Sequence, residues 1–187
     1  MMTQVPFESL PQRVFLDSST LQVLQDYGGP VWDNEPIPDN DRIHCFPDGP
    51  ATVEALRRIF FVNQRALWHF ALSANSLREV AAKGDARYLQ WAYDVLDHWQ
   101  ICVEETGPPS SRGQEMAAKL ETPSFGYLGE GDRKLLFDAV ALECDAFLTC
   151  DRRLARNSYH LNAKLGILVL TPIQHWEILK PWAGLYV

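Results

Sequence analysis

The stretch GEGDRKLLFDAVALECDAFLTCDRRLARN, residues 129–157, carries the most informative pattern in the chain. Its first part predicts an amphipathic helix over residues 132–143, and the apolar residues that follow predict a short strand at 146–149. Asp151 then opens a further helical turn. Because an apolar strand directly after an amphipathic helix is typical of a parallel α/β layer, this stretch predicts the fold class.

Asp132 lies on the apolar side of the first predicted helix, within about 60° of Leu135 and Leu136 on a helical projection. A carboxylate there either serves a site or caps the helix, since Asp after Gly-Glu-Gly suits a helix start. Asp151 could cap the next helical turn in the same way. Asp138 stands at helical neighbour spacing from Lys134, which favours a solvated, partly paired acid and not a metal ligand.

Apolar strands recur along the rest of the chain. Residues 14–16 predict a central strand that ends at Asp17, and residues 166–171 predict a last strand before a final helix. Between them we predict a helix over 52–66, a strand over 67–72 and a helix over 85–103. The predicted fold class is therefore α/β, with a three-layer α/β/α arrangement around a central, mostly parallel sheet.

The 187 residues suit a single domain that spans residues 1–187. Glycine, proline and scattered acids over residues 27–50 predict an irregular surface insertion. Residues 104–128 predict a connector with one helical turn at 115–120.

The composition restricts partners and location. The formal net charge of -7 argues mildly against a nucleic-acid partner, although carboxylates gathered around a metal ion would contribute to that charge. No apolar run approaches the ~20 residues that a membrane span needs, and no secretory leader is evident at the N-terminus, so we expect no membrane partner and a cytoplasmic location. The four cysteines show no C-x-x-C spacing and are expected to be reduced thiols.

Four carboxylates stand at equivalent places in the predicted fold. Asp17 and Asp151 each follow a strand, Glu79 follows another strand, and Asp132 opens a helix. If these strands are adjacent and parallel, the four side chains converge at one edge of the sheet. Hard oxygen ligands without sulfur or imidazole favour Mg²⁺ or Mn²⁺. An alternative for Glu79 is a capping box with Ser76, which would explain both residues without a site.

These residues resemble the PIN domain, the nuclease fold of VapC-type toxins. The resemblance is carried by Asp17 after VFL, Glu79 in SLREV, Asp132 nineteen positions before Asp151, and above all the run ALECDAFLTCDRRL. The closing GILVLTP is similar to the last strand and helix of that family. The chain departs from a compact toxin of this type in its length, chiefly through residues 27–50 and 104–128, and in its acidic composition.

The resemblance implies metal-dependent cleavage of RNA phosphodiester bonds. Asp17, Glu79, Asp132 and Asp151 would be the catalytic, metal-binding acids, and Ser18 or Thr149 would give polar support. The chemistry of divalent cations suggests a mechanism, in which bound Mg²⁺ or Mn²⁺ lowers the pKa of a water molecule that attacks the phosphate. Arg152 and Arg153 are expected to hold the phosphate backbone.

Two other functions remain compatible with the sequence. The main alternative is a non-catalytic RNA-binding or protein-interaction module, in which the same acids cap helices; another is a metal-dependent phosphatase. The sequence leaves open whether DNA is cut in place of RNA. It also leaves open whether an antitoxin-like protein or a second copy of the chain binds as a partner.

Overall fold

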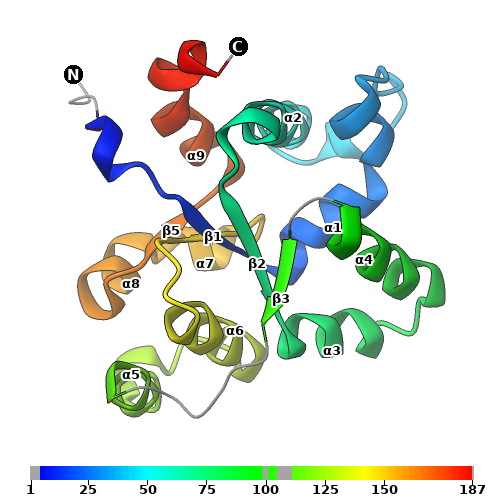
Figure 1. Ribbon diagram of the computed structural model, residues 1–187. Helices are drawn as coiled ribbons and strands as arrows, with labels where there is room; N and C mark the ends of the chain where they lie inside the picture. Colours follow the sequence, from blue (N-terminus) through cyan, green and yellow to red (C-terminus); the bar gives the residue numbers. More distant parts are fainter. Residues whose placement is uncertain (1–4, 99–100, 105–110, 187) are drawn as a thin grey trace.

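The computed structural model describes residues 5–98, 101–104 and 111–186, and it has a central five-stranded sheet (Figure 1). The strand order is β3-β2-β1-β4-β5, and each neighbouring pair is parallel. The strands are β1 (Arg13–Leu16), β2 (His69–Ser73), β3 (Ile101–Glu104), β4 (Ala146–Leu148) and β5 (Leu168–Leu170). The predicted α/β class with a parallel sheet is therefore confirmed.

Helices cover both faces of the sheet and make the predicted three layers. Along β1, Val14 and Leu16 point into one core while Phe15 points into the other, as expected for alternating side chains. The first core is covered by α1 (Ser18–Asp26), α2 (Gly49–Ala66), α3 (Ala74–Ala82), α4 (Ala86–His98) and α9 (Pro172–Leu179). The second is covered by α5 (Ser111–Leu120), α6 (Glu130–Ala141), α7 (Arg152–Arg156) and α8 (Ser158–Leu165).

The strand order contains one switch point, between β1 and β4. From β1 the chain moves outward to β2 and β3, with connecting helices on the first face. It then crosses by way of α5 and α6 on the second face and adds β4 on the other side of β1. In open α/β sheets, ligands bind outside the carboxyl ends of the strands at such a point. The segments that follow β1 and β4 are therefore the first place to look for a site.

The segment 27–50 lies largely on the surface, and a few of its apolar side chains anchor it to the first core. It contains two short helical turns, η2 (Gly29–Asp33) and η3 (Arg42–Cys45), and it ends where α2 begins. Tyr27, Val31 and Ile43 are buried in the first core. Three apolar side chains spaced among glycines and prolines are enough to anchor the segment, although they give no helical or strand periodicity.

The region around residues 98–128 also differs from the prediction. The predicted helix over 85–103 ends at His98, and β3 follows it as a sheet strand that was not predicted. The connector contains the whole of α5 and a 3-10 turn, η4 (Pro123–Phe125), while its residues 105–110 lie outside the described residues. Leu120 and Phe125 are buried in the second core, so this part of the connector belongs to the domain. Within the described ranges, no helix combines the length and apolar character needed to cross a membrane.

Candidate active site

Asp17 lies at the carboxyl end of β1, beside the switch point. Its amide donates to the carbonyl of Leu148 at 3.0 Å. This hydrogen bond extends the pairing of β1 with β4 one residue beyond the end of β1. The side chain is only 5% exposed, and although Asp17 is the N-cap residue of α1, it makes no side-chain capping bond there. A carboxylate that is buried without serving as a cap needs other polar partners.

Two hydroxyl groups supply those partners. Ser19 Oγ donates to Asp17 Oδ2 at 2.5 Å, and Thr149 Oγ1 donates to the same oxygen at 2.7 Å. Ser19 Oγ also accepts the amide of Cys150 at 3.0 Å, and Thr149 Oγ1 accepts the amide of Asp151 at 2.9 Å. The segment after β1 is thus joined through its side chains to the segment after β4.

Ser19, and not Ser18, gives Asp17 the hydroxyl support that was expected from Ser18 or Thr149, and Thr149 adds a second hydroxyl. The supporting hydroxyl belongs to Ser19, whereas the carbonyl of Ser18 accepts a hydrogen bond from the Tyr88 hydroxyl at 3.2 Å. Both Ser19 and buried Tyr88 were missed in the sequence. For Ser19 the signal was present in the run of hydroxyl residues after Asp17; for Tyr88, inside an apolar helix stripe, there was none.

Asp132 is the third residue of α6 and lies half-buried. The N-cap is Gly129 and not Asp132, but Asp132 Oδ2 accepts the amide of Gly129 at 3.3 Å, so the side chain contributes to capping from the third helix position. Partial burial raises its pKa, the bond from Gly129 lowers it, and the negative charges of Asp17 and Asp151 raise it further. The side chain of Asp132 therefore both contributes to capping of α6 and lies near the other acids.

Asp151 is the N-cap residue of α7, and its Oδ1 accepts the amide of Arg153 at 2.6 Å. The capping role expected for Asp151 is therefore present. The same residue is tied to Thr149 through its amide and acts electrostatically on Asp132. Asp151 thus caps a helix while it lies at the same edge of the sheet as Asp17.

Glu79 does not belong to a capping box with Ser76. The box at the start of α3 is formed by Ser73 and Ser76, and Glu79 follows in the second turn, not in the first as the sequence suggested. Its carboxylate reaches the first turn of α6, where a Cβ added to Gly131 would lie 2.6 Å from Glu79 Oε1. Glycine at position 131 therefore lets Glu79 lie beside the helix turn that carries Asp132.

The four acids affect one another electrostatically. Burial raises the pKa of Asp17, the bonds from Ser19 and Thr149 lower it, and the charge of Glu79 raises it. Together with the effect of Asp17 and Asp151 on Asp132, this connects all four carboxylates at one edge of the sheet.

The donor set suits a hard divalent cation, because it consists of carboxylate and hydroxyl oxygens. The nearby thiol of Cys150 is neutral, since burial raises its pKa to about 12. In the part of the chain that the structure describes, no three His, Cys, Asp or Glu side chains are placed to hold one metal ion. The oxygens are directed elsewhere: Asp132 and Asp151 each accept a helix amide, and Asp17 Oδ2 accepts two hydroxyls. These residues fit Mg²⁺ or Mn²⁺ by chemistry, and binding would need Asp132 and Asp151 to rotate away from the helix amides.

Asp138 was interpreted wrongly as a solvated acid beside Lys134. It is buried, and its Oδ2 accepts Ser73 Oγ at 2.5 Å and Asn75 Nδ2 at 2.8 Å, while Oδ1 has no hydrogen-bond partner among the described residues. Lys134 pairs instead with Glu130 at 2.6 Å. Asp138 therefore joins the start of α3, which carries Glu79, to α6, which carries Asp132.

The two arginines expected to hold phosphate differ in their contacts. Arg152 pairs with Asp48 at 3.1 Å and also donates to the carbonyl of Pro47, so it joins α7 to the segment 27–50. Arg153 is exposed and gives its backbone amide to Asp151. Arg152 is thus directed toward a neighbouring part of the surface, where a pocket lies.

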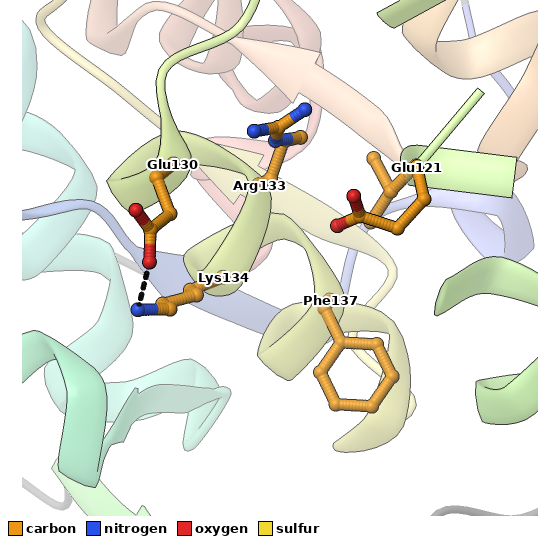
Figure 2. A pocket seen from close by; sticks show the side chains of 6 residues that line it. Glu121, Glu130, Arg133, Lys134 and Phe137 are labelled. Atoms are coloured by element: carbon orange, nitrogen blue, oxygen red, sulfur yellow. Dashed lines mark hydrogen bonds and ion pairs between the residues drawn. The ribbon is translucent and has the colours of Figure 1, made fainter. Parts of the chain in front are cut away.

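A second basic cluster, Arg133 with Lys134, lines a pocket of about 380 Å³ on the side of α6 that faces the end of α5 (Figure 2). Glu121 and Glu130 line the same pocket, and Figure 2 shows Glu130 joined to Lys134. Two acids therefore offset the two basic residues there, and the pocket offers little attraction to phosphate.

Comparison of the chain with protein-family models, with curated proteins and with solved structures found no match in any of the three.

Proposed function

We propose that this protein is a PIN-like, divalent-metal-dependent nuclease that hydrolyses phosphodiester bonds in RNA. The observation that supports it is the electrostatic effect of Glu79 on Asp17, and of Asp17 and Asp151 on Asp132, beside the switch point of a parallel sheet. Four carboxylates from separate segments repel one another, and a cation among them would relieve that repulsion. Capping alone would not require Asp17 to be buried or Glu79 to lie against α6.

Each residue has a role in this proposal. Asp17, Asp132 and Asp151 would hold Mg²⁺ or Mn²⁺, and Glu79 would bind a second ion or position water. When bound, the metal supplies an activated water and neutralises charge on the phosphate. Ser19 and Thr149 keep Asp17 oriented by donating to one of its oxygens, which leaves the carboxylate little freedom to rotate.

The test compares Asp17→Asn and Asp132→Asn with the wild-type protein on a fluorescent single-stranded RNA in Mn²⁺. Both variants should lose at least about a hundredfold in cleavage rate, because the amide is a poor ligand for a hard cation. Circular dichroism should stay unchanged, since Asn retains an acceptor oxygen. Asp39→Asn, at an exposed position in the segment 27–50, is the control and should cleave at the wild-type rate. Metal-dependent cleavage retained by both site variants would rule out the proposal.

A non-catalytic module on the same fold is the second candidate, and the capping bonds made by Asp132 and Asp151 favour it. Calorimetry with Mn²⁺ separates the two functions, because acids that only cap helices should bind no ion specifically. The nuclease should bind Mn²⁺ with an affinity that Asp17→Asn reduces.

A further inference from the structure

A second pocket lies directly beside the acidic edge of the sheet. It has a volume of about 380 Å³, within the usual range for small-molecule sites, and Cys150 lines it one residue before Asp151. Much of its wall comes from the segment 27–50, and its lining includes Tyr27, Arg42, Ile43, Phe46, Pro47 and Arg152. A ligand bound in this pocket could therefore extend to the carboxylates, so that one part of it lies in the pocket and another part lies at the acids.

The pocket combines an aromatic ring with two guanidinium groups. Phe46 is 58% exposed, although large apolar side chains are usually covered, and Ile43 and Pro47 extend the apolar wall. Arg42 and Arg152 line the same pocket. A flat apolar ring next to planar cations is suited to a nucleobase stacked on Phe46 with a phosphate held by arginine.

Both arginines form ion pairs in the structure, and both pairs lie at the surface. Arg42 pairs with Asp26 at 2.7 Å and Arg152 pairs with Asp48 at 3.1 Å. Ion pairs at the surface contribute little to stability, so each guanidinium can exchange its carboxylate for a phosphate at small cost. The pairs hold the arginines at the pocket when no ligand is bound.

The wall of the pocket is held in place by hydrogen bonds. Asp41 Oδ1 accepts the Tyr27 hydroxyl at 2.8 Å and the amide of Ile43 at 2.8 Å. These bonds hold the turn η3, which leads into Phe46, against α1. A site ordered before binding loses less conformational entropy when the ligand arrives.

We propose that this pocket binds one nucleotide of single-stranded RNA, with its base against Phe46 and a phosphate between Arg42 and Arg152, next to the bond that is cut. The inference rests on the proposed nuclease function and assigns the substrate as single-stranded, because a base inside a duplex is stacked and cannot enter the pocket. Asp26 also lines this pocket, so it holds one acid beside two arginines, whereas the pocket on α6 holds two acids beside two basic residues. A third pocket, near Trp32 and Phe61, shares no lining residue with the segments that follow β1 and β4.

The experiment measures binding of the full chain to fluorescein-labelled RNA by anisotropy, in EDTA so that no cleavage occurs. Phe46→Ala should weaken binding of a single-stranded oligoribonucleotide by about tenfold, the loss expected for one stacked base. Arg42→Gln should weaken it by a similar factor. The matched controls are Tyr159→Ala, which removes a ring that is 88% exposed on α8, and Arg58→Gln on α2; both should bind as the wild type does.

The outcomes separate this inference from the nuclease proposal. The wild-type protein should bind the single strand at least about tenfold more tightly than the same sequence as a duplex, and Phe46→Ala should reduce that preference. Equal affinity of Phe46→Ala and Tyr159→Ala would overturn the pocket assignment even if the wild type cleaves RNA. Tighter binding of single-stranded DNA would overturn RNA as the ligand. Wild-type binding that Phe46→Ala weakens, without any cleavage in Mn²⁺, would support the pocket and overturn only the nuclease.

Discussion

Thr149 donates a hydrogen bond of 2.7 Å to Asp17 across 132 positions of the sequence, and both side chains are buried. The same hydroxyl accepts the amide of Asp151. This residue therefore holds together the ends of β1 and β4, on which the candidate site depends.

Thr149→Val removes that hydroxyl with almost no change in volume. The buried carboxylate of Asp17 loses one donor and the amide of Asp151 loses its acceptor, so the free energy of unfolding should fall by about 1–3 kcal/mol. Urea denaturation measures the loss. Thr122→Val removes a hydroxyl that bonds the carbonyl of Lys119 at an exposed position, and it should change stability by less than about 0.5 kcal/mol. Equal effects of the two variants would contradict the assigned role of Thr149.

Gly131→Ala should separate activity from stability. The new Cβ would lie 2.6 Å from Glu79 Oε1, so the flexible end of Glu79 must move away from α6. Alanine is the better helix former, and we expect the helix to gain up to about 1 kcal/mol. RNA cleavage in Mn²⁺ should decrease while the melting temperature stays the same or rises. Gly184→Ala, where a Cβ meets open space, should leave cleavage unchanged; an active Gly131→Ala enzyme would exclude Glu79 from the site.

Asp138→Ala should be among the more destabilising changes at an acidic residue of this protein. It leaves the buried hydroxyl of Ser73 and the amide of Asn75 without their acceptor, at a cost of about 3 kcal/mol. Asp138→Asn keeps an acceptor oxygen and removes a buried charge, so it should cost about 1 kcal/mol. Chemical denaturation of both variants checks the order, and the reverse order would show that the charge of Asp138 is needed.

His175 should make stability depend on pH. Complete burial lowers its pKa to about 4, compared with about 6.5 in the unfolded chain. The folded state therefore keeps His175 neutral, while the unfolded state takes up a proton as the pH falls below about 6.5. This contribution to stability is complete above that value and decreases toward pH 4, by about 2 kcal/mol between pH 7 and pH 5.

The pH dependence can be assigned by substitution. His175→Gln should remove most of the decrease in unfolding free energy between pH 7 and pH 5, measured by urea denaturation at both values. His69→Gln, at an exposed position of β2, should leave the decrease intact. If the unfolding free energy of His175→Gln decreased between pH 7 and pH 5 as much as that of the wild type, other groups would be its cause.

Arg152→Gln should act on RNA binding without affecting the fold. Its pair with Asp48 is exposed, so the free energy of unfolding should change by less than about 1 kcal/mol. If Arg152 contacts one phosphate of a single strand, the slope of log Kd against log salt should decrease by about 0.7. Anisotropy titrations over a range of KCl concentrations measure the slope. Arg58→Gln should keep the wild-type slope, and the same result for Arg152 would exclude the phosphate contact.

Patterns within short stretches predicted much of this fold correctly. The helix expected over 132–143 is α6, Glu130–Ala141, and the strand expected at 146–149 is β4. Asp17 was placed at a carboxyl end because apolar residues precede it and hydroxyl residues follow it. In these stretches local preference and tertiary packing favour the same structure.

The failures lie where a contact between distant segments decides the outcome. Lys134 is four residues from both Glu130 and Asp138, and only the approach of Ser73 and Asn75 to α6 leaves Asp138 buried and Lys134 with Glu130. β3 was missed because Ile101–Glu104 follows directly on an apolar helix stripe, and pairing with β2 distinguishes it as a strand. Ser19 could not be separated from Ser18 until the position of Thr149 was known.

The position of β1 at the centre of the sheet has a consequence for synthesis of the protein. The partner strand β4 leaves the ribosome more than a hundred residues after β1, so the edge that holds Asp17 stays open while those residues are made. A nascent chain that has reached β3 has β2 beside β1 and lacks both Asp132 and Asp151. Any chemistry that needs Asp17, Asp132 and Asp151 together would then begin only after β4 and the start of α7 have been made.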